Sequence, residues 1–268
     1  MSEERRTLSF VGAAAWTIGM ALVVDVALSI TEVARPGAAL DLVNVTMCHV
    51  LAYSAVILAM LRVYAPDTPV RKVVAFRGAP VMVIVLAIAI GACLYPAASW
   101  LDALAAKRFP TTPESTEALA KLMTTATLPK RLFLGAALVL IMPIAEEIYF
   151  RGVLFGELKP GRTPGMVILG TAVYFAIARA DLRSFASVLA LGAVLGWMRD
   201  RTRSIVPTIL AQAAFFAVPI IPILRGRDPM ADEVYSRAWT LGGLAAAALA
   251  AAAIEGMSRA WARDDHDA

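Results

Sequence analysis

Histidine and cysteine are nearly absent from this chain. Only two histidines and two cysteines occur among its 268 residues, so a site built from several histidines cannot be assembled. Both cysteines, Cys48 and Cys93, lie inside apolar segments. The sequence therefore indicates neither a disulfide framework nor a cysteine-based metal site.

Charge is also scarce. Charged residues make up 17% of the chain and hydrophobic residues 59%, with a mean hydropathy of +0.70, whereas a soluble domain carries about 25% charged residues. The composition predicts an all-α, polytopic transmembrane helical bundle that has the lipid bilayer as its partner. No run of basic residues occurs, so the net charge of +4 does not indicate a nucleic-acid partner.

Eight apolar windows set the expected organisation. Windows close to the ~20 residues that span a bilayer lie at 8–30, 41–63, 79–98 and 131–155, and shorter or interrupted windows lie at 165–180, 185–198, 204–224 and 237–256. We expect about eight helices in a single membrane domain over residues 1–268. The first window is too long for the apolar region of a signal peptide, so we expect a retained helix.

One long connection and one tail lie outside these windows. We expect residues 99–130 to form an interfacial connection that begins with a short helix at Trp100–Phe109. A second helix should start at Pro113, since proline suits the first helical turn. A surface connector is favoured here over a lid, and residues 257–268 are expected to be a mobile C-terminal tail.

The distribution of Lys and Arg favours cytoplasmic N- and C-termini. Outside the 99–130 connection, most basic residues fall in segments that are expected on the same side of the membrane as the N-terminus. Cytoplasmic loops show this excess of Lys and Arg. We expect an integral protein of a bacterial plasma membrane.

Three charges lie in the middle of the window at 131–155. Glu146, Glu147 and Arg151 would each cost roughly 2.5–3.5 kcal/mol at a bilayer centre, so they need compensation or a purpose. Glu147 and Arg151 form an i,i+4 pair in the favourable order. The turn after this window contains Arg162. Glu146 lies 16 residues before Arg162, and Arg179 lies 17 residues after Arg162. Equal helical rise brings both to the same depth, so Arg179 is the expected partner of Glu146.

The following helices add small and polar residues at helical spacing. Gly192 and Gly196 form a GxxxG pair, for which intramolecular packing is favoured over a dimer contact. Gln212 and Phe216 share one face of the next helix by their i,i+4 spacing. That helix is expected to be interrupted by three prolines, namely Pro207, Pro219 and Pro222.

Taken in order, these patterns resemble the CPBP family of intramembrane proteases, which includes type II CAAX endopeptidases, Abi domains and lysostaphin-resistance-like proteins. Residues 146–152 read EEIYFRG and are similar to the family signature EExxxRG. Phe175 and Arg179 occupy the positions of its FxxxH motif, and Gln212 and Phe216 those of its HxxxN motif. The resemblance covers about 131–220, which should be the CPBP-like core.

The resemblance assigns Glu146 and Glu147 to the catalytic glutamates and implies an active site open to the cytoplasm. In the family, glutamate and histidines either hold a metal or activate water. Arg179 can do neither, because its guanidinium stays protonated and accepts no hydrogen bond; Gln212 is a poor metal ligand, and Phe216 offers no polar group. No metal is expected, and zinc only if the protein is an active protease.

Three functions stay open. The first is a proteolytically silent homologue with a binding or scaffolding role. The second is an active intramembrane endopeptidase that cleaves CAAX-type, prenylated or membrane peptides, with Glu146 activating water and Gln212 serving the oxyanion. The third is a transporter or channel using polar residues of the first two helices. The plainer interpretation of those residues is that Asp41 and Asn44 cap a helix, His49 is a hydrogen-bonded packing residue and Asp25 lies near a helix end.

Overall fold

The computed structural model describes residues 7–110, 112–123, 127–226 and 235–267, and within them the regular structure is helical. In chain order, the elements are α1 (Phe10–Ala34), η1 (Ala38–Leu40), α2 (Leu42–Tyr64), α3 (Val70–Val73), α4 (Val81–Ala106), α5 (Pro113–Met123), α6 (Leu128–Ala136), η2 (Ala137–Ile141), α7 (Met142–Glu147), η3 (Ile148–Leu154), α8 (Phe155–Leu158), α9 (Pro164–Ala178), α10 (Phe185–Thr202), α11 (Val206–Leu224) and α12 (Arg237–Asp267). The predicted all-α class is confirmed.

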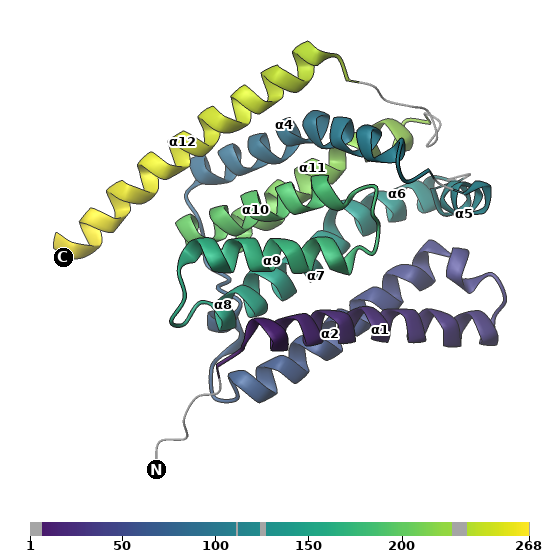
Figure 1. Cartoon of the computed structure of the whole chain (residues 1–268), viewed down its shortest axis with the longest axis horizontal. Coiled ribbons are helices and arrows are strands. Elements are labelled where there is room, and N and C mark those ends of the chain that lie inside the picture. Colours follow the sequence, from purple (N-terminus) through teal and green to yellow (C-terminus); the bar gives the residue numbers. More distant parts are fainter. Residues whose placement is uncertain (1–6, 111, 124–126, 227–234, 268) are drawn as a thin grey trace.

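The long helices run back and forth along one axis (Figure 1). Six helical segments of the described chain are long and apolar enough to cross a membrane, namely α1, α2, α4, the continuous stretch Leu128–Leu158, α11 and Arg237–Ser258 of α12. These six segments imply a lipid bilayer. The helix α9 also fills its predicted window, but its 15 residues extend only about 22 Å, less than the ~30 Å hydrocarbon core.

The helices pack around the stretch Leu128–Leu158. Helix α4 lies against α11 and α12, α10 lies against α9, and α1 contacts both α2 and α9, while α2 and α11 each contact α7. Helix α1 begins and α12 ends at one end of the bundle (Figure 1), which we call the hairpin end because the α8–α9 turn lies there. We call the other end, at which α12 begins, the opposite end.

Glycines permit the closest helix contacts. A Cβ atom on Gly91 would lie 1.9 Å from the carbonyl oxygen of Ala211, so α4 and α11 touch backbone to backbone. A Cβ on Gly192 would lie 3.0 Å from Cα of Ala172, and one on Gly196 would lie 3.3 Å from a methyl carbon of Ile168. The GxxxG pair therefore packs α10 against α9, and the prediction of intramolecular packing is confirmed.

The connection at 99–130 is shorter than expected. The predicted short helix at Trp100–Phe109 is wrong as a separate element, because α4 continues through Pro96 as far as Ala106. The alanine-rich sequence after Pro96 favours helix, and contact with α12 supports it. The second predicted helix is present as α5, which begins at Pro113.

Two further boundaries differ from expectation. Helix α11 is continuous from Val206 to Leu224, so none of the three prolines interrupts it. Pro207 lies in the first turn, where proline is tolerated, and packing against α4 offsets the backbone hydrogen bonds that Pro219 and Pro222 remove. The C-terminal residues 257–267 continue α12, and their mobility stays a prediction.

Candidate functional site: a buried carboxylate and guanidinium cluster

The first ion pair of the site joins Glu147 and Arg151 within one helical stretch. Arg151 Nη1 lies 2.6 Å from Glu147 Oε1, and both side chains have an exposed fraction of 0%. The pair is the predicted i,i+4 contact. A charged pair this deeply buried is stable only when its remaining polar atoms find partners.

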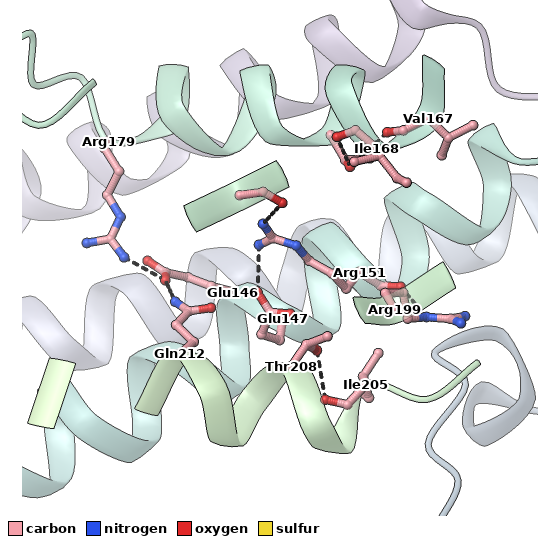
Figure 2. A network of polar contacts seen from close by, with 12 residues as sticks. Glu146, Glu147, Arg151, Val167, Ile168, Arg179, Arg199, Ile205, Thr208 and Gln212 are labelled. Carbon is pink, nitrogen blue, oxygen red and sulfur yellow. Dashed lines mark hydrogen bonds and ion pairs between the residues drawn. The ribbon is translucent and has the colours of Figure 1, made fainter. Parts of the chain in front are cut away.

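Arg151 finds further partners on α9 and α10. Its Nη2 donates to the backbone carbonyl of Gly192 at 3.1 Å, and its guanidinium carbon lies 4.4 Å from the ring centroid of Phe175. Because Gly192 has no side chain, its carbonyl can approach the guanidinium while α10 packs on α9. Arg151 therefore ties the motif stretch to both neighbouring helices, and Figure 2 shows its bond to Glu147.

The second ion pair is the one predicted from helix depth. Arg179 Nη2 donates to Glu146 Oε2 at 2.7 Å, and the exposed fractions of these side chains are 31% and 4%. Gln212 Nε2 donates to the same Oε2 atom, as Figure 2 shows. Arg179 is the C-cap residue of α9, where the negative end of the helix dipole favours a cation.

Two aromatic rings lie close to the Arg179 guanidinium. Its central carbon lies 5.4 Å from the ring centroid of Phe175 and 5.0 Å from that of Phe216. Both distances fit cation–π contacts. The two phenylalanines that the sequence placed at motif positions thus pack against the arginine that replaces the motif histidine.

Arg199 is a member of the cluster that sequence reasoning missed. It is buried, with an exposed fraction of 8%, and its Nε donates to the backbone carbonyl of Arg151 at 2.9 Å. The stretch Ile148–Leu154 is π-helical, and the N–H of Phe155 donates to the carbonyl of Phe150, five residues back. The carbonyl that Arg199 contacts lies within this π-helical stretch. A basic residue at the end of α10 gave no signal of this contact, because such residues are usually solvated.

Four buried polar atoms of the cluster lack a hydrogen-bond partner in the described structure. They are Glu147 Oε2, Arg151 Nε, Arg179 Nε and Gln212 Oε1. Each costs free energy unless water or another group reaches it. The cluster is therefore strongly paired in charge but incompletely paired in hydrogen bonds.

Comparison with known proteins finds one family match. Residues 128–218 match the family model described as type II CAAX prenyl endopeptidase Rce1-like. These residues form an Rce1-like domain. The matched segment runs from α6 into α11 and contains every member of the cluster. No curated protein and no solved structure matches the chain.

The side chains of this Rce1-like domain do not fit a zinc ion. Tetrahedral zinc takes sulfur, imidazole or carboxylate ligands, and no group of three or more such side chains gathers within the described residues. Glu146 and Glu147 are each bound to a guanidinium. The two ion pairs already sum to zero charge and the buried Arg199 adds a positive one, so a divalent cation would add uncompensated charge to a buried site.

Outside the Rce1-like domain, the polar residues of α1 and α2 make mostly local contacts. Asp41 caps α2 by accepting from the N–H of Val43 at 3.0 Å and pairs with Arg35 at 2.7 Å, and this ion pair lowers the pKa of Asp41. His49 Nδ1 lies 2.8 Å from the carbonyl of Val45. These contacts match the plainer interpretation of both residues.

Two expectations about this region need correction. Asn44 does not cap α2, because its side-chain amide reaches back to Thr31 Oγ1 at 2.9 Å and to the carbonyl of Ala38 at 3.0 Å. Asp25 does not lie near a helix end, because α1 continues to Ala34. Its side chain is exposed in the middle of a candidate membrane span.

Proposed function

We propose that this protein is a proteolytically silent membrane protein of the CPBP family that acts by binding rather than by cleavage. The observation that supports this most directly is the state of Glu146. The carboxylate at the family's catalytic position accepts hydrogen bonds from Arg179 and Gln212 at the same oxygen. A general base must present an acceptor oxygen to the water that it activates, and the Oε2 atom of this carboxylate is already occupied by two donors.

The chemistry of the replacing residues supports the same conclusion. A guanidinium remains protonated and has no acceptor, so Arg179 cannot replace an imidazole that accepts a proton or holds a metal. Phe216 contacts the Arg179 guanidinium with its ring and offers no donor to an oxyanion. Arg179 and Gln212 both bond Glu146, and Phe216 packs on Arg179. Contacts of this kind are what a structural role for these side chains requires.

A cleavage assay with matched variants tests this proposal. The wild type, the triple variant Arg179→His/Gln212→His/Phe216→Asn, and that triple variant with Glu146→Ala would be incubated in proteoliposomes with prenylated CAAX peptides and membrane peptides. We expect no turnover by the wild type. Turnover by the triple variant that disappears with Glu146→Ala would show that the scaffold retains the family geometry. Wild-type turnover that is lost in the single variant Glu146→Ala would refute the proposal.

One observation favours the active endopeptidase as a second candidate. Gln212 Oε1 and Glu147 Oε2 are buried acceptors without a partner among the described residues, and a water molecule could donate to such atoms. If that water were the nucleophile, Glu146→Gln would abolish a measurable cleavage and Arg179→Ala would reduce it. Cleavage that is unchanged in Glu146→Gln would exclude this candidate.

A further inference from the structure

A large cavity lies apart from the charged cluster, between α4, α10 and α12. Its volume is about 520 Å³, within the range of small-molecule sites. Leu94, Leu191, Val194 and Leu244 contribute to a predominantly aliphatic wall. Because α4 and α12 are candidate membrane spans, the groups available to fill this cavity are those of the bilayer or of a molecule dissolved in it.

The polar groups of the cavity gather at one end. Trp100 lies in the last two turns of α4, Ser187 in the first turn of α10, and Arg237 and Thr240 in the first turn of α12. These turns meet at the opposite end of the bundle (Figure 1). The aliphatic residues Leu94, Val194 and Leu244 lie farther along their helices from that end. The cavity therefore has a polar mouth and an apolar body.

Arg237 gives the mouth a positive charge. It is exposed and forms no ion pair with any residue that the structure describes. A guanidinium binds phosphate with two parallel hydrogen bonds, and Trp100, which lines the same cavity, is a residue type that is enriched at the level of lipid headgroups. A ligand with a phosphate at one end and a hydrocarbon tail at the other complements both parts of the cavity.

We propose that this cavity binds one anionic phospholipid, with the phosphate at Arg237 and an acyl tail between α4, α10 and α12. The wall of the tail region reaches the charged cluster through two rings. Phe215 lines the cavity, its ring centroid lies 5.3 Å from that of Phe216, and Phe216 contacts Arg179. The lipid site does not depend on whether the cluster cleaves peptides.

Photo-crosslinking of lipids to the full-length protein tests this site. The protein would be placed in bilayers that contain equal amounts of phosphatidylglycerol and phosphatidylcholine, one of them carrying a diazirine in its acyl chain, and crosslinked peptides would be mapped by mass spectrometry. We expect crosslinks at cavity residues of α4, α10 and α12, about fivefold more from phosphatidylglycerol, because its net negative charge attracts the arginine whereas the choline of phosphatidylcholine cancels the phosphate charge.

Matched variants separate the headgroup from the tail. Arg237→Gln should remove the preference for phosphatidylglycerol, whereas Arg225→Gln, which changes an exposed arginine at the same end outside the cavity, should keep it. Ala190→Phe in the cavity wall should reduce crosslinking of both lipids severalfold, and Ala246→Phe on an exposed part of α12 should not. Thermal unfolding of each variant verifies that it is folded.

Three outcomes would overturn the proposal. Equal crosslinking of the two lipids to the cavity would show that the cavity does not select an anionic headgroup. Crosslinks spread evenly over the exposed faces of the bundle would show bulk bilayer contact only. Displacement of the crosslinks by a farnesylated peptide but not by excess phosphatidylglycerol would assign the cavity to a peptide ligand.

Discussion

Replacing Arg179 with glutamine should destabilise the protein far more than removing a surface cation. The Glu146 side chain has an exposed fraction of 4% and that of Arg179 31%. Loss of one partner of a fully buried pair costs about 3–5 kcal/mol, because the other charge stays buried without compensation. Partial exposure of Arg179 and the remaining bond from Gln212 reduce this value, so we expect about 2–3 kcal/mol for Arg179→Gln.

The assay is reversible unfolding in mixed detergent micelles, with the variants Arg179→Gln, Glu146→Gln and the double variant forming a cycle. The coupling free energy should lie at about 2 kcal/mol, toward the upper part of the range for neighbouring residues. Lys121→Gln is the matched control, since Lys121 pairs with Glu117 at 2.8 Å but both side chains are more than half exposed, and its cost should be about 0.5 kcal/mol or less. An Arg179→Gln cost no larger than this control would refute the reasoning.

Two more predictions concern packing and topology. Gly91→Ala should destabilise the protein by about 3 kcal/mol or more, because its Cβ would lie 1.9 Å from the carbonyl oxygen of Ala211; Gly19→Ala, where nothing lies within 4 Å of the new atom, should be neutral or stabilising by up to about 1 kcal/mol in the same unfolding assay. The topology prediction uses single cysteines in a background without the native ones, because Thr163 and Leu182 flank α9. Thr163→Cys should react with a membrane-impermeant maleimide from the side that exposes a C-terminal tag, and Leu182→Cys should react from the other side. Labelling of both from one side would contradict the arrangement of α9.

The ion pairs could be predicted from the sequence because they depend on helix geometry alone. Glu147 and Arg151 are one turn apart, and Glu146 and Arg179 are almost equally distant from the turn between their helices, so a constant rise per residue brings each pair together. The contact of Arg199 could not be predicted, because it joins a side chain at the end of α10 to a backbone carbonyl of another helix, and no residue type marks such a contact.

Helix ends were the less predictable part of the fold. Helix α4 continues past Pro96 and α1 continues past Asp25, although a proline and a charge both favour an earlier end. In each case contact with a neighbouring helix outweighs the local preference, and such contacts are absent from a single-sequence pattern. The cavity between α4, α10 and α12 gave no sequence signal for the same reason, since its walls come from three separate windows.

Two expectations about orientation do not agree with each other in this structure. The basic residues favour a cytoplasmic hairpin end, whereas the family resemblance implies a site open to the cytoplasm. Arg179 is the most exposed member of the two ion pairs, and it lies at the end of α9 that is remote from the α8–α9 turn. If the basic residues set the orientation, this exposed member lies nearer the outer surface. The same two cysteine variants, labelled from outside in intact cells, decide between the two.

The π-helical stretch Ile148–Leu154 has a consequence for chain length. Each residue added to or removed from a helix turns everything on one side of it by about 100°. A π-helical turn holds about one residue more than an α-helical turn, so removing a residue here would restore a regular α-helix, whereas removing one from α8 (Phe155–Leu158) would rotate Glu146 and Glu147 away from Arg179 and α10. The spacing between the two glutamates and the α8–α9 turn is thus as much a part of the site as the residues themselves.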